Sequence, residues 1–231
     1  MRGFLYNTEE LLFCISKKMN LESLIDEYDG SSDQFHLLTN ELKNIIKEII
    51  SNDSEMKKIL LDSYIHQLGF EKYTIQNLTN GKSIRLHFWP NKNSSKEDIH
   101  SHCASFKSII LNGTIKQNSY DLVTGTDTKT FLYTFDSQTR SSKAEETGLT
   151  SYKIRKSITL VKNNFYNQNY NLMHQVAETD SNTLTISLWE KREYPAIVLK
   201  ELSSNTQDCT HTSNLSEEFL QRRLQKILEL F

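Results

Sequence analysis

Two histidines separated by one residue, His100 and His102, have the type and spacing that most directly suggest chemistry in this sequence. On a β-strand, side chains two positions apart project from the same face, so both imidazoles could reach one ion. Taken alone the pair is a weak signal, because imidazole is a common metal ligand but also a common surface group. A third imidazole, His174, follows an Asn-rich segment at 163–171. Its alternative role is a structural one, as a buried core residue.

Short β-rich segments must position these histidines. Residues 83–89 alternate small or polar side chains with Ile84, Leu86 and Phe88, as a half-buried strand does. Further strands are expected at 108–111, 114–123, 129–135, 152–161, 183–189 and 196–200. Several short strands separated by polar turns favour a sandwich or barrel over a βαβ sheet. The polar, Ser/Thr-rich segment 136–150 is predicted to be a mobile loop.

Helical periodicity flanks this β region on both sides. Between residues 8 and 69 there are two apolar stripes, the second ending at Gly69: Leu38, Leu42, Ile45, Ile46 and Ile49, then Met56, Leu60, Tyr64 and Leu68. After a polar linker, one C-terminal face carries Leu220, Leu224, Ile227, Leu228 and Phe231. We therefore expect a helical N-terminal region (1–80) packing on a barrel (81–202), then a linker and C-terminal helix (203–231). A partner-binding helix is the alternative for the N-terminal region.

The spacing of the histidines resembles the two sequence motifs of the cupin superfamily. In the first motif, two histidines separated by one residue are followed by a glutamate and, after six more residues, by a glycine. In this sequence Phe106 stands at the glutamate position and Gly113 at the glycine position. The second motif supplies His174, with Asn163 and Asn171 at its glycines and Asn169 at its proline. The resemblance implies a mainly β fold, a cupin (jelly-roll) barrel with N-terminal helices and a C-terminal helix. It also implies one metal ion bound by His100, His102 and His174.

Without the glutamate, three neutral imidazoles remain, an arrangement similar to the thiol dioxygenase branch of the cupins. That branch implies Fe(II), with Ni, Zn or Mn as other first-row candidates, and O2-dependent oxidation of a small molecule. In cysteine dioxygenase an arginine follows a Tyr-Thr pair and holds the substrate carboxylate, but Ile75 stands here, so cysteine is not the expected substrate. Lys191 stands at the position of the family's tyrosine, and strand alternation directs Cys103 away from the metal. No Cys–Tyr thioether is therefore expected.

No catalytic acid or base can be assigned, which disfavours an isomerase or epimerase. The candidate substrate contacts are Tyr73, Arg85, His87, Phe106 and Trp189. Arg85, or Arg155 on another strand, could hold an anion, whereas the alternative for each is a solvated outer face. For the aromatic residues the alternative is core packing. A second class of function stays open, a non-catalytic small-molecule-binding or sensing protein, because one barrel architecture serves many activities.

The overall composition limits the partners. The chain has 231 residues, a formal net charge of −2 and a mean hydropathy of −0.55. Such a balanced charge gives no long-range attraction to nucleic acid or anionic membranes, so a small-molecule substrate and O2 are the expected partners. Glu9 and Glu10 come before any apolar segment typical of a secretory signal could develop. The three cysteines, Cys14, Cys103 and Cys209, are odd in number and widely spread, which fits reduced thiols. A cytoplasmic location is expected, and the oligomeric state is left open.

Overall fold

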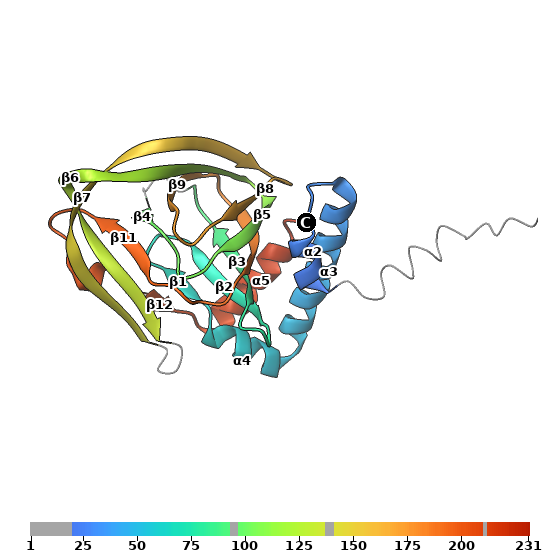
Figure 1. Cartoon of the computed structure of the whole chain (residues 1–231). Coiled ribbons are helices and arrows are strands. Elements are labelled where there is room, and N and C mark those ends of the chain that lie inside the picture. Colours follow the sequence, from blue (N-terminus) through green and yellow to red (C-terminus); the bar gives the residue numbers. More distant parts are fainter. Residues whose placement is uncertain (1–19, 93–96, 137–140, 210–211) are drawn as a thin grey trace, which may run out of the picture.

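The computed structural model describes residues 20–92, 97–136, 141–209 and 212–231, so the expectations about the first residues and Cys14 lie outside the described part. Two antiparallel sheets face each other (Figure 1). The seven-stranded sheet has the order β12-β1-β2-β3-β10-β5-β8, and the five-stranded sheet has the order β11-β4-β9-β6-β7. Strand β11 also pairs with β6, which closes part of the second sheet on itself.

The strands of the seven-stranded sheet are β1 (Tyr64–His66), β2 (Glu71–Asn77), β3 (Ser83–Trp89), β5 (Phe106–Asn112), β8 (Phe165–Gln168), β10 (Thr183–Trp189) and β12 (Thr212–Asn214). Those of the other sheet are β4 (Ile99–His100), β6 (Thr114–Asp136), β7 (Ser141–Val161), β9 (Met173–Thr179) and β11 (Ala196–Lys200). The strands expected at 83–89, 183–189 and 196–200 have these bounds in the structure. The mainly β, jelly-roll architecture with flanking helices is confirmed.

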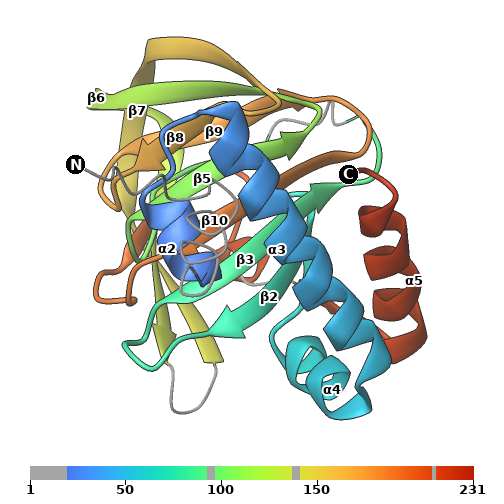
Figure 2. The ribbon, with the colours of Figure 1, turned by 90° about the vertical axis from the view of Figure 1, so that its right-hand side faces the viewer.

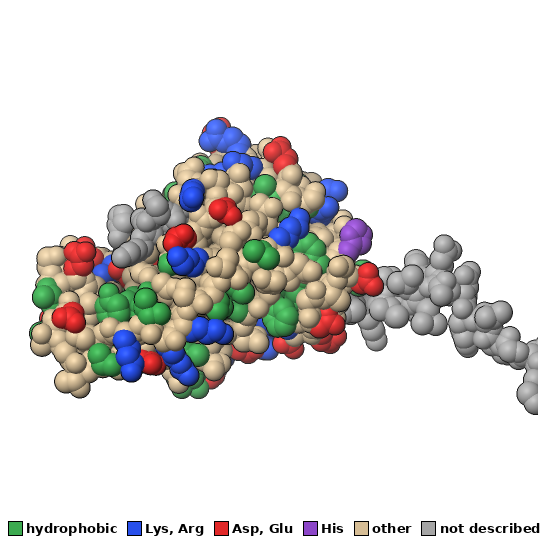
Figure 3. Space-filling view, turned by 90° about the horizontal axis from the view of Figure 1, so that it is seen from above, with side chains coloured by type: hydrophobic (Ala, Val, Ile, Leu, Met, Phe, Trp, Pro, Cys, Tyr) green, Lys and Arg blue, Asp and Glu red, His purple; other side chains and the backbone are tan. Residues whose placement is uncertain are grey.

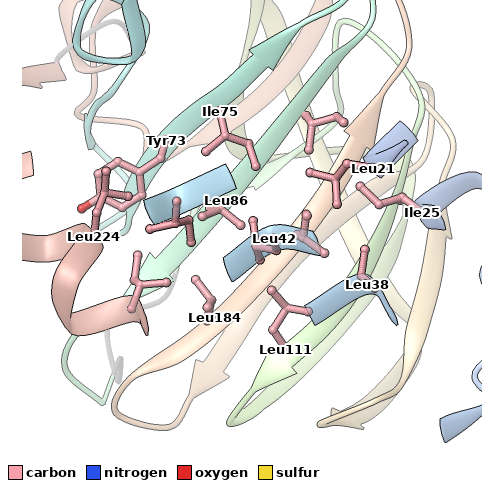
Figure 4. Packing of buried hydrophobic residues seen from close by; sticks show 14 of the residues in the cluster. Leu21, Ile25, Leu38, Leu42, Tyr73, Ile75, Leu86, Leu111, Leu184 and Leu224 are labelled. Atoms are coloured by element: carbon pink, nitrogen blue, oxygen red, sulfur yellow. The ribbon is translucent and has the colours of Figure 1, made fainter. Parts of the chain in front are cut away.

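The helices cover the outer face of the seven-stranded sheet (Figure 2). They are α2 (Leu21–Asp26), α3 (Ser32–Ser51), α4 (Asp53–Leu61) and α5 (Glu217–Leu228), and a 3-10 turn, η1, spans Thr206–Cys209. The side-chain oxygens of Asn20, Ser31, Asn52 and Ser216 accept backbone N–H groups at the four N-termini. Figure 4 shows apolar residues of these helices interdigitating with those of β2, β3, β5 and β10. This helix–sheet layer is the main hydrophobic core.

The second N-terminal helix is shorter than its apolar stripe predicts. Helix α4 ends at Leu61, and Tyr64 begins β1 instead of continuing the helix. Gly69, which was expected to end the helix, lies at φ 85° in the turn between β1 and β2, where its N–H donates to the His66 carbonyl at 2.9 Å. Strand β1 hydrogen-bonds to both β2 and β12, so tertiary pairing overrides a weak helical pattern. Sheet structure therefore begins before residue 81.

The prediction of a loop at 136–150 is wrong for its described residues. Residues 141–150 belong to β7, which pairs with β6 from Asp136↔Ser141 onwards to form a long hairpin. The two strands expected at 114–123 and 129–135 are one strand, β6, with an irregularity between Val123 and Thr128. Most side chains of β7 are exposed, and residues 141–150 include few apolar side chains, so this half of the strand shows no hydrophobic alternation in the sequence. The other half, where Tyr152, Ile154, Ile158 and Leu160 alternate with polar residues, was predicted as a strand at 152–161. Within the described residues, no helix is long and apolar enough to cross a membrane.

Candidate metal centre

Three histidines converge at one point between the two sheets. The candidate ligand nitrogens of His100, His102 and His174 all lie within 4.8 Å of one another. His100 ends β4 and is the direct register partner of His174 on β9. His102 lies just beyond the strand, in a segment where its N–H donates to the Tyr170 carbonyl at 2.9 Å. The expected convergence is present, although only His100 lies within a strand and His102 follows in irregular chain.

The rings are oriented by their other nitrogen atoms and by aromatic neighbours. His100 Nδ1 lies 2.9 Å from the Asp98 carbonyl, so this nitrogen donates and leaves Nε2 as a free ligand. The Nε2 atoms of His102 and His174 are 2.6 Å apart. The His102 ring also packs edge-on against Phe106 and Trp189, with centroid distances of 5.0 and 5.1 Å. Phe106 thus places an apolar ring where the first motif would have a carboxylate ligand.

A pair of buried glutamines controls the proton on His174. Gln168 Nε2 donates to the Leu172 carbonyl at 2.9 Å, which turns its Oε1 toward Gln117. Gln117 Nε2 donates to that oxygen at 3.1 Å and lies 2.8 Å from His174 Nδ1. Nδ1 of His174 therefore accepts a hydrogen bond. The ring proton of His174 is then on Nε2, which points toward His102. Gln117 Oε1 is buried and has no hydrogen-bond partner within the described residues.

Burial keeps the three imidazoles neutral. It is the main cause that lowers the pKa of His100, and it moves the pKa values of His102 and His174 well below the usual value, with further lowering from the neighbouring rings. Neutral imidazole is the form that ligates metal ions. A metal site composed of these residues needs no deprotonation at neutral pH.

The donor set fits a first-row divalent ion. His102 and His174, whose Nε2 atoms are 2.6 Å apart, would hold such an ion together with His100 if these two nitrogens separated slightly. To ligate through Nε2, His174 must carry its proton on Nδ1 and needs an acceptor there. The unpartnered Oε1 of Gln117 would supply this acceptor if the amide group turned over, which breaks its 3.1 Å hydrogen bond to Gln168 and requires the Gln168 amide to turn as well.

A cavity of about 330 Å³ opens beside the histidines. His100 and His102 form part of its wall, together with Arg85, His87 and Trp189, three of the candidate substrate contacts. Phe106 lies behind this wall, stacked on Trp189 with ring centroids 4.1 Å apart. The structure therefore brings four of the five candidates to the three histidines or to the cavity beside them.

Tyr73 is the exception among the candidate contacts. Its fully buried side chain points into the helix–sheet core beside Leu224, away from the cavity (Figure 4). Its hydroxyl contacts Glu71, which is in turn paired with Arg223. Arg155 lies on β7 with its side chain 61% exposed, 4.0 Å from Asp121. Neither residue borders the cavity.

Sequence reasoning missed several residues of the cavity wall. Tyr64 and His66 border it from β1, which had been read as helix, and Tyr133 borders it from the part of β6 that lies near the hairpin end. Arg192, just after β10, also borders it. The two-residue spacing of Tyr64 and His66 was a usable signal of a strand face. Cys103, expected to point away, borders the cavity too, because regular strand alternation ends at His100.

No protein-family model matches this sequence, and no curated protein matches it. Among solved structures, a variant of Bacillus subtilis oxalate decarboxylase aligns with 8% identity and a TM-score of 0.35, over 62% of this chain and 31% of the other. Hydroquinone 1,2-dioxygenase in complex with Cd²⁺ and 4-hydroxybenzonitrile aligns with 9% identity and a TM-score of 0.30, over 51% and 62%. A cupin-like protein from Thermotoga maritima aligns with 14% identity and a TM-score of 0.30, over 64% and 85%. This chain covers less than a third of the oxalate decarboxylase.

Proposed function

We propose that this protein is a mononuclear non-haem metal protein of the cupin type that oxidises a small molecule with O2, and that its metal is Fe(II). The observation that carries the proposal is the convergence of His100, His102 and His174 beside a cavity of small-molecule size. Three imidazoles leave coordination positions open, and a bound ion would supply activation of O2 and a point of attachment for substrate. Imidazole also accepts Ni, Zn and Mn, so the metal must be identified by measurement.

The chemistry we propose is that of a thiol dioxygenase acting on a thiol other than cysteine. In such a reaction R–SH and O2 give R–SO2H, both oxygen atoms ending on sulfur, and no external reductant is needed. Ile75 is 4% exposed and packs in the helix–sheet core, so this position offers no contact to a substrate carboxylate. Arg85, Arg192 and Lys72 border the cavity and would repel the ammonium group of cysteine.

The protein's own groups would position the substrate and exclude water. Trp189 is 6% exposed and forms the floor between Arg85 and His102. Phe106 packs behind it and offers no fourth ligand from that side. Asp98 fixes the ring of His100 through its carbonyl group. The cytoplasmic location expected from the sequence is kept as part of the proposal.

The decisive experiment measures metal content and O2 consumption together. Protein loaded anaerobically with Fe(II) should hold one ion per chain and consume O2 with a suitable thiol, forming the sulfinate, whereas cysteine should be a poor substrate. His174→Ala should lose the ion and the activity while its circular dichroism spectrum stays unchanged, because core burial supplies most of the stability. His36→Ala, on the exposed side of α3, is the matched control. Full metal occupancy in His174→Ala would refute the proposal.

A non-catalytic small-molecule-binding or sensing protein is the second candidate. The observation that favours it is that the rings packed on His102 are those of Phe106 and Trp189, neither of which transfers protons. Under this alternative, small molecules would raise the melting temperature of the metal-loaded protein without any O2 uptake. Turnover of one of the stabilising compounds would decide for the enzyme.

A further inference from the structure

Arg85 is a buried cation for which no carboxylate of the described residues forms an ion pair. Its side chain leaves β3 toward the cavity and is 8% exposed. Nε donates to Ser83 Oγ at 2.9 Å, and the guanidinium stacks over Trp189 with its central carbon 4.2 Å from the ring centroid. A buried charge without a counter-charge costs several kcal/mol. An anion that enters the cavity would remove this cost.

The surroundings of Arg85 increase the need for an anion. Burial and then the nearby Arg192 lower the pKa of Arg85 to about 9, so it stays charged at neutral pH. Lys72 borders the same cavity. Of the two carboxylates in the wall, Asp98 is paired with Lys200, 2.5 Å from its Nζ, whereas Asp62 accepts from Asn77 at 2.9 Å and its negative charge acts to raise the pKa of Arg85. Three cations, Arg85, Arg192 and Lys72, stand against the charge of Asp62, so the wall on the side of Arg85 is net positive.

Trp189 connects this electropositive side to the histidines. One indole carries the Arg85 guanidinium, and its ring centroid is 5.1 Å from that of His102 and 6.1 Å from that of His87. A small molecule with its anionic end on Arg85 would lie along the indole and reach toward His102. Phe70 and Tyr64 add apolar surface to the same wall.

The outer surface shows no comparable concentration of positive charge on the face seen in Figure 3. Basic and acidic side chains alternate there over short distances. The formal net charge of the chain is −2. The net positive charge around Arg85 faces into the cavity, where a small molecule can meet it.

We infer that the cavity binds a small carboxylate without a positively charged amine, its carboxylate on the Arg85 guanidinium and its apolar part against Trp189. A planar guanidinium can hold a carboxylate through two parallel hydrogen bonds, which adds geometric selectivity to the charge attraction. An ammonium group would meet Arg85, Arg192 and Lys72 together. The identity of the site as a substrate site rests on the proposed function, whereas the carboxylate contact itself needs no metal.

The test uses pairs of probes that differ in charge, measured by isothermal titration calorimetry on chelator-treated, metal-free protein. Benzoate is compared with benzamide, which has the same shape and no charge. Propanoate is compared with β-alanine, which adds an ammonium group. Benzoate should bind at least ten-fold more tightly than benzamide, and propanoate more tightly than β-alanine. Equal affinities within both pairs, or no binding of either carboxylate, would overturn the inference.

Variants test whether Arg85 causes the preference for carboxylates. Arg85→Met keeps a long apolar side chain and should weaken benzoate binding at least ten-fold while leaving benzamide unchanged. Arg155→Met, on the exposed hairpin, is the matched control and should behave as the unmodified protein. If circular dichroism shows that Arg85→Met does not fold, Arg192→Met should still weaken benzoate several-fold. Unchanged benzoate affinity in the folded Arg85→Met variant, or in Arg192→Met, would contradict the inference.

Metal titration of the same proteins separates this inference from the proposed function. His174→Ala should keep its benzoate affinity in the metal-free assay, and Arg85→Met should still bind one metal ion. Benzoate binding by a protein that takes up no metal would leave the carboxylate contact standing and refute the metal proposal. Binding of one metal ion per chain without any preference for carboxylates would refute the carboxylate inference and leave the metal proposal standing.

Discussion

At the scale of single residues, Gln117 is the side chain whose role the metal proposal makes most specific. In the present arrangement its amide donates to Gln168 and faces an accepting Nδ1 of His174, while its own oxygen has no partner in the described structure. Ligation through His174 Nε2 moves the proton to Nδ1 and requires the amide to turn over. Metal binding is thereby coupled to a buried hydrogen-bond pair that does not touch the ion.

Replacing Gln117 with leucine should lower metal affinity roughly ten- to hundred-fold, the usual effect of losing such an outer hydrogen bond. The reason is that Nδ1–H of a ligating His174 would then be buried without an acceptor. The measurement is competition with a chelator of known affinity, using Co(II) or Zn(II). Gln76→Leu, at an exposed position of β2, serves as the control. Equal affinities of the two variants would show that Gln117 does not position His174.

Two backbone positions explain why the spacing of the two motifs is kept although some of their residue types are replaced. Gly113 has φ 79°, and a side chain there would meet Thr183 Oγ1 at 2.4 Å and its Cα at 2.9 Å. Asn163 has φ 75° at the position of the second motif's first glycine. Asparagine tolerates this left-handed region better than most residues, so the turn before His174 survives the substitution. Asn171, at the motif's other glycine, does not have a positive φ.

At the scale of elements, a buried ion pair holds α5 against the sheet. Arg223 Nε lies 2.7 Å from Glu71 Oε2, and Arg223 Nη2 donates to Glu71 Oε1 at 2.7 Å. Tyr73 also donates to Glu71, which is 4% exposed. Tyr73, considered from the sequence as a substrate contact, thus belongs to a network that fixes the helix.

Arg223→Met should lower the free energy of unfolding by about 3–5 kcal/mol, because it leaves the Glu71 carboxylate buried and unpaired. Urea unfolding followed by circular dichroism is the measurement. The adjacent Arg222→Met is a close control, since Arg222 lies 3.7 Å from Glu218 at an exposed position and its loss should cost less than about 1 kcal/mol. Adding Glu71→Gln to Arg223→Met should recover part of the loss. Similar effects of the two arginine substitutions would contradict this account.

The long β6–β7 hairpin is an element that contributes to the cavity without contributing to the main core. Tyr133, Phe135 and Ser142 border the cavity, and Tyr133 and Ser142 are joined by a hydroxyl contact of 2.6 Å. The guanidinium carbon of Arg192 lies 4.2 Å from the ring centroid of Phe135. One cation of the proposed carboxylate site is therefore positioned by Phe135 of the hairpin, in the segment 129–135 that was predicted as a strand.

At the scale of the whole molecule, the histidines inside the barrel make stability depend on pH. Burial lowers the pKa of His66 to about 3 and moves those of His87, His102 and His174 well below the usual value. A group with a depressed folded-state pKa favours folding above its unfolded pKa of ~6.5, and this contribution is lost as the pH falls. At pH 5 each of the four histidines would cost on the order of 1–2 kcal/mol relative to pH 7.

A buried acid opposes this effect but is outweighed. Burial raises the pKa of Glu97 to about 8, so its contribution is largest at low pH and is lost as the pH rises toward 8. As the pH falls from 7 to 5, Glu97 would add about 2–3 kcal/mol of stability, which is less than the four histidines together would cost. We expect metal-free protein to lose several kcal/mol of stability over this range, measured as a lower melting temperature in calorimetry.

A variant of one histidine tests the sign and the size of this dependence. His66→Asn retains an acceptor for the Leu68 N–H and removes one buried imidazole. As the pH decreases, the stability of this variant should fall less steeply than that of the unmodified protein. The two slopes should differ by about 1.4 kcal/mol per pH unit. The exposed His36→Asn should leave the slope unchanged. A slope that His66→Asn does not alter would show that His66 titrates alike in the folded and unfolded states.

The sequence by itself determined the features whose physical cause is local. The alternation in β3 and β10, the apolar run of β11, the apolar faces of α3 and α5, and the turn at Gly113 all follow from the types of neighbouring residues. The spacing of His100, His102 and His174 also predicted their convergence, which depends on few positions.

Only the tertiary structure decided the features that depend on distant partners. The first half of β7, residues 141–150, is held by its ladder to β6, and β1 is defined by β2 and β12, so neither segment carries a strong local signal. The surroundings of Arg85 likewise come from Trp189 and Arg192, far along the chain. An arginine in an alternating strand is usually a solvated outer residue, and only the closure of two sheets around it turns its charge into a candidate binding site.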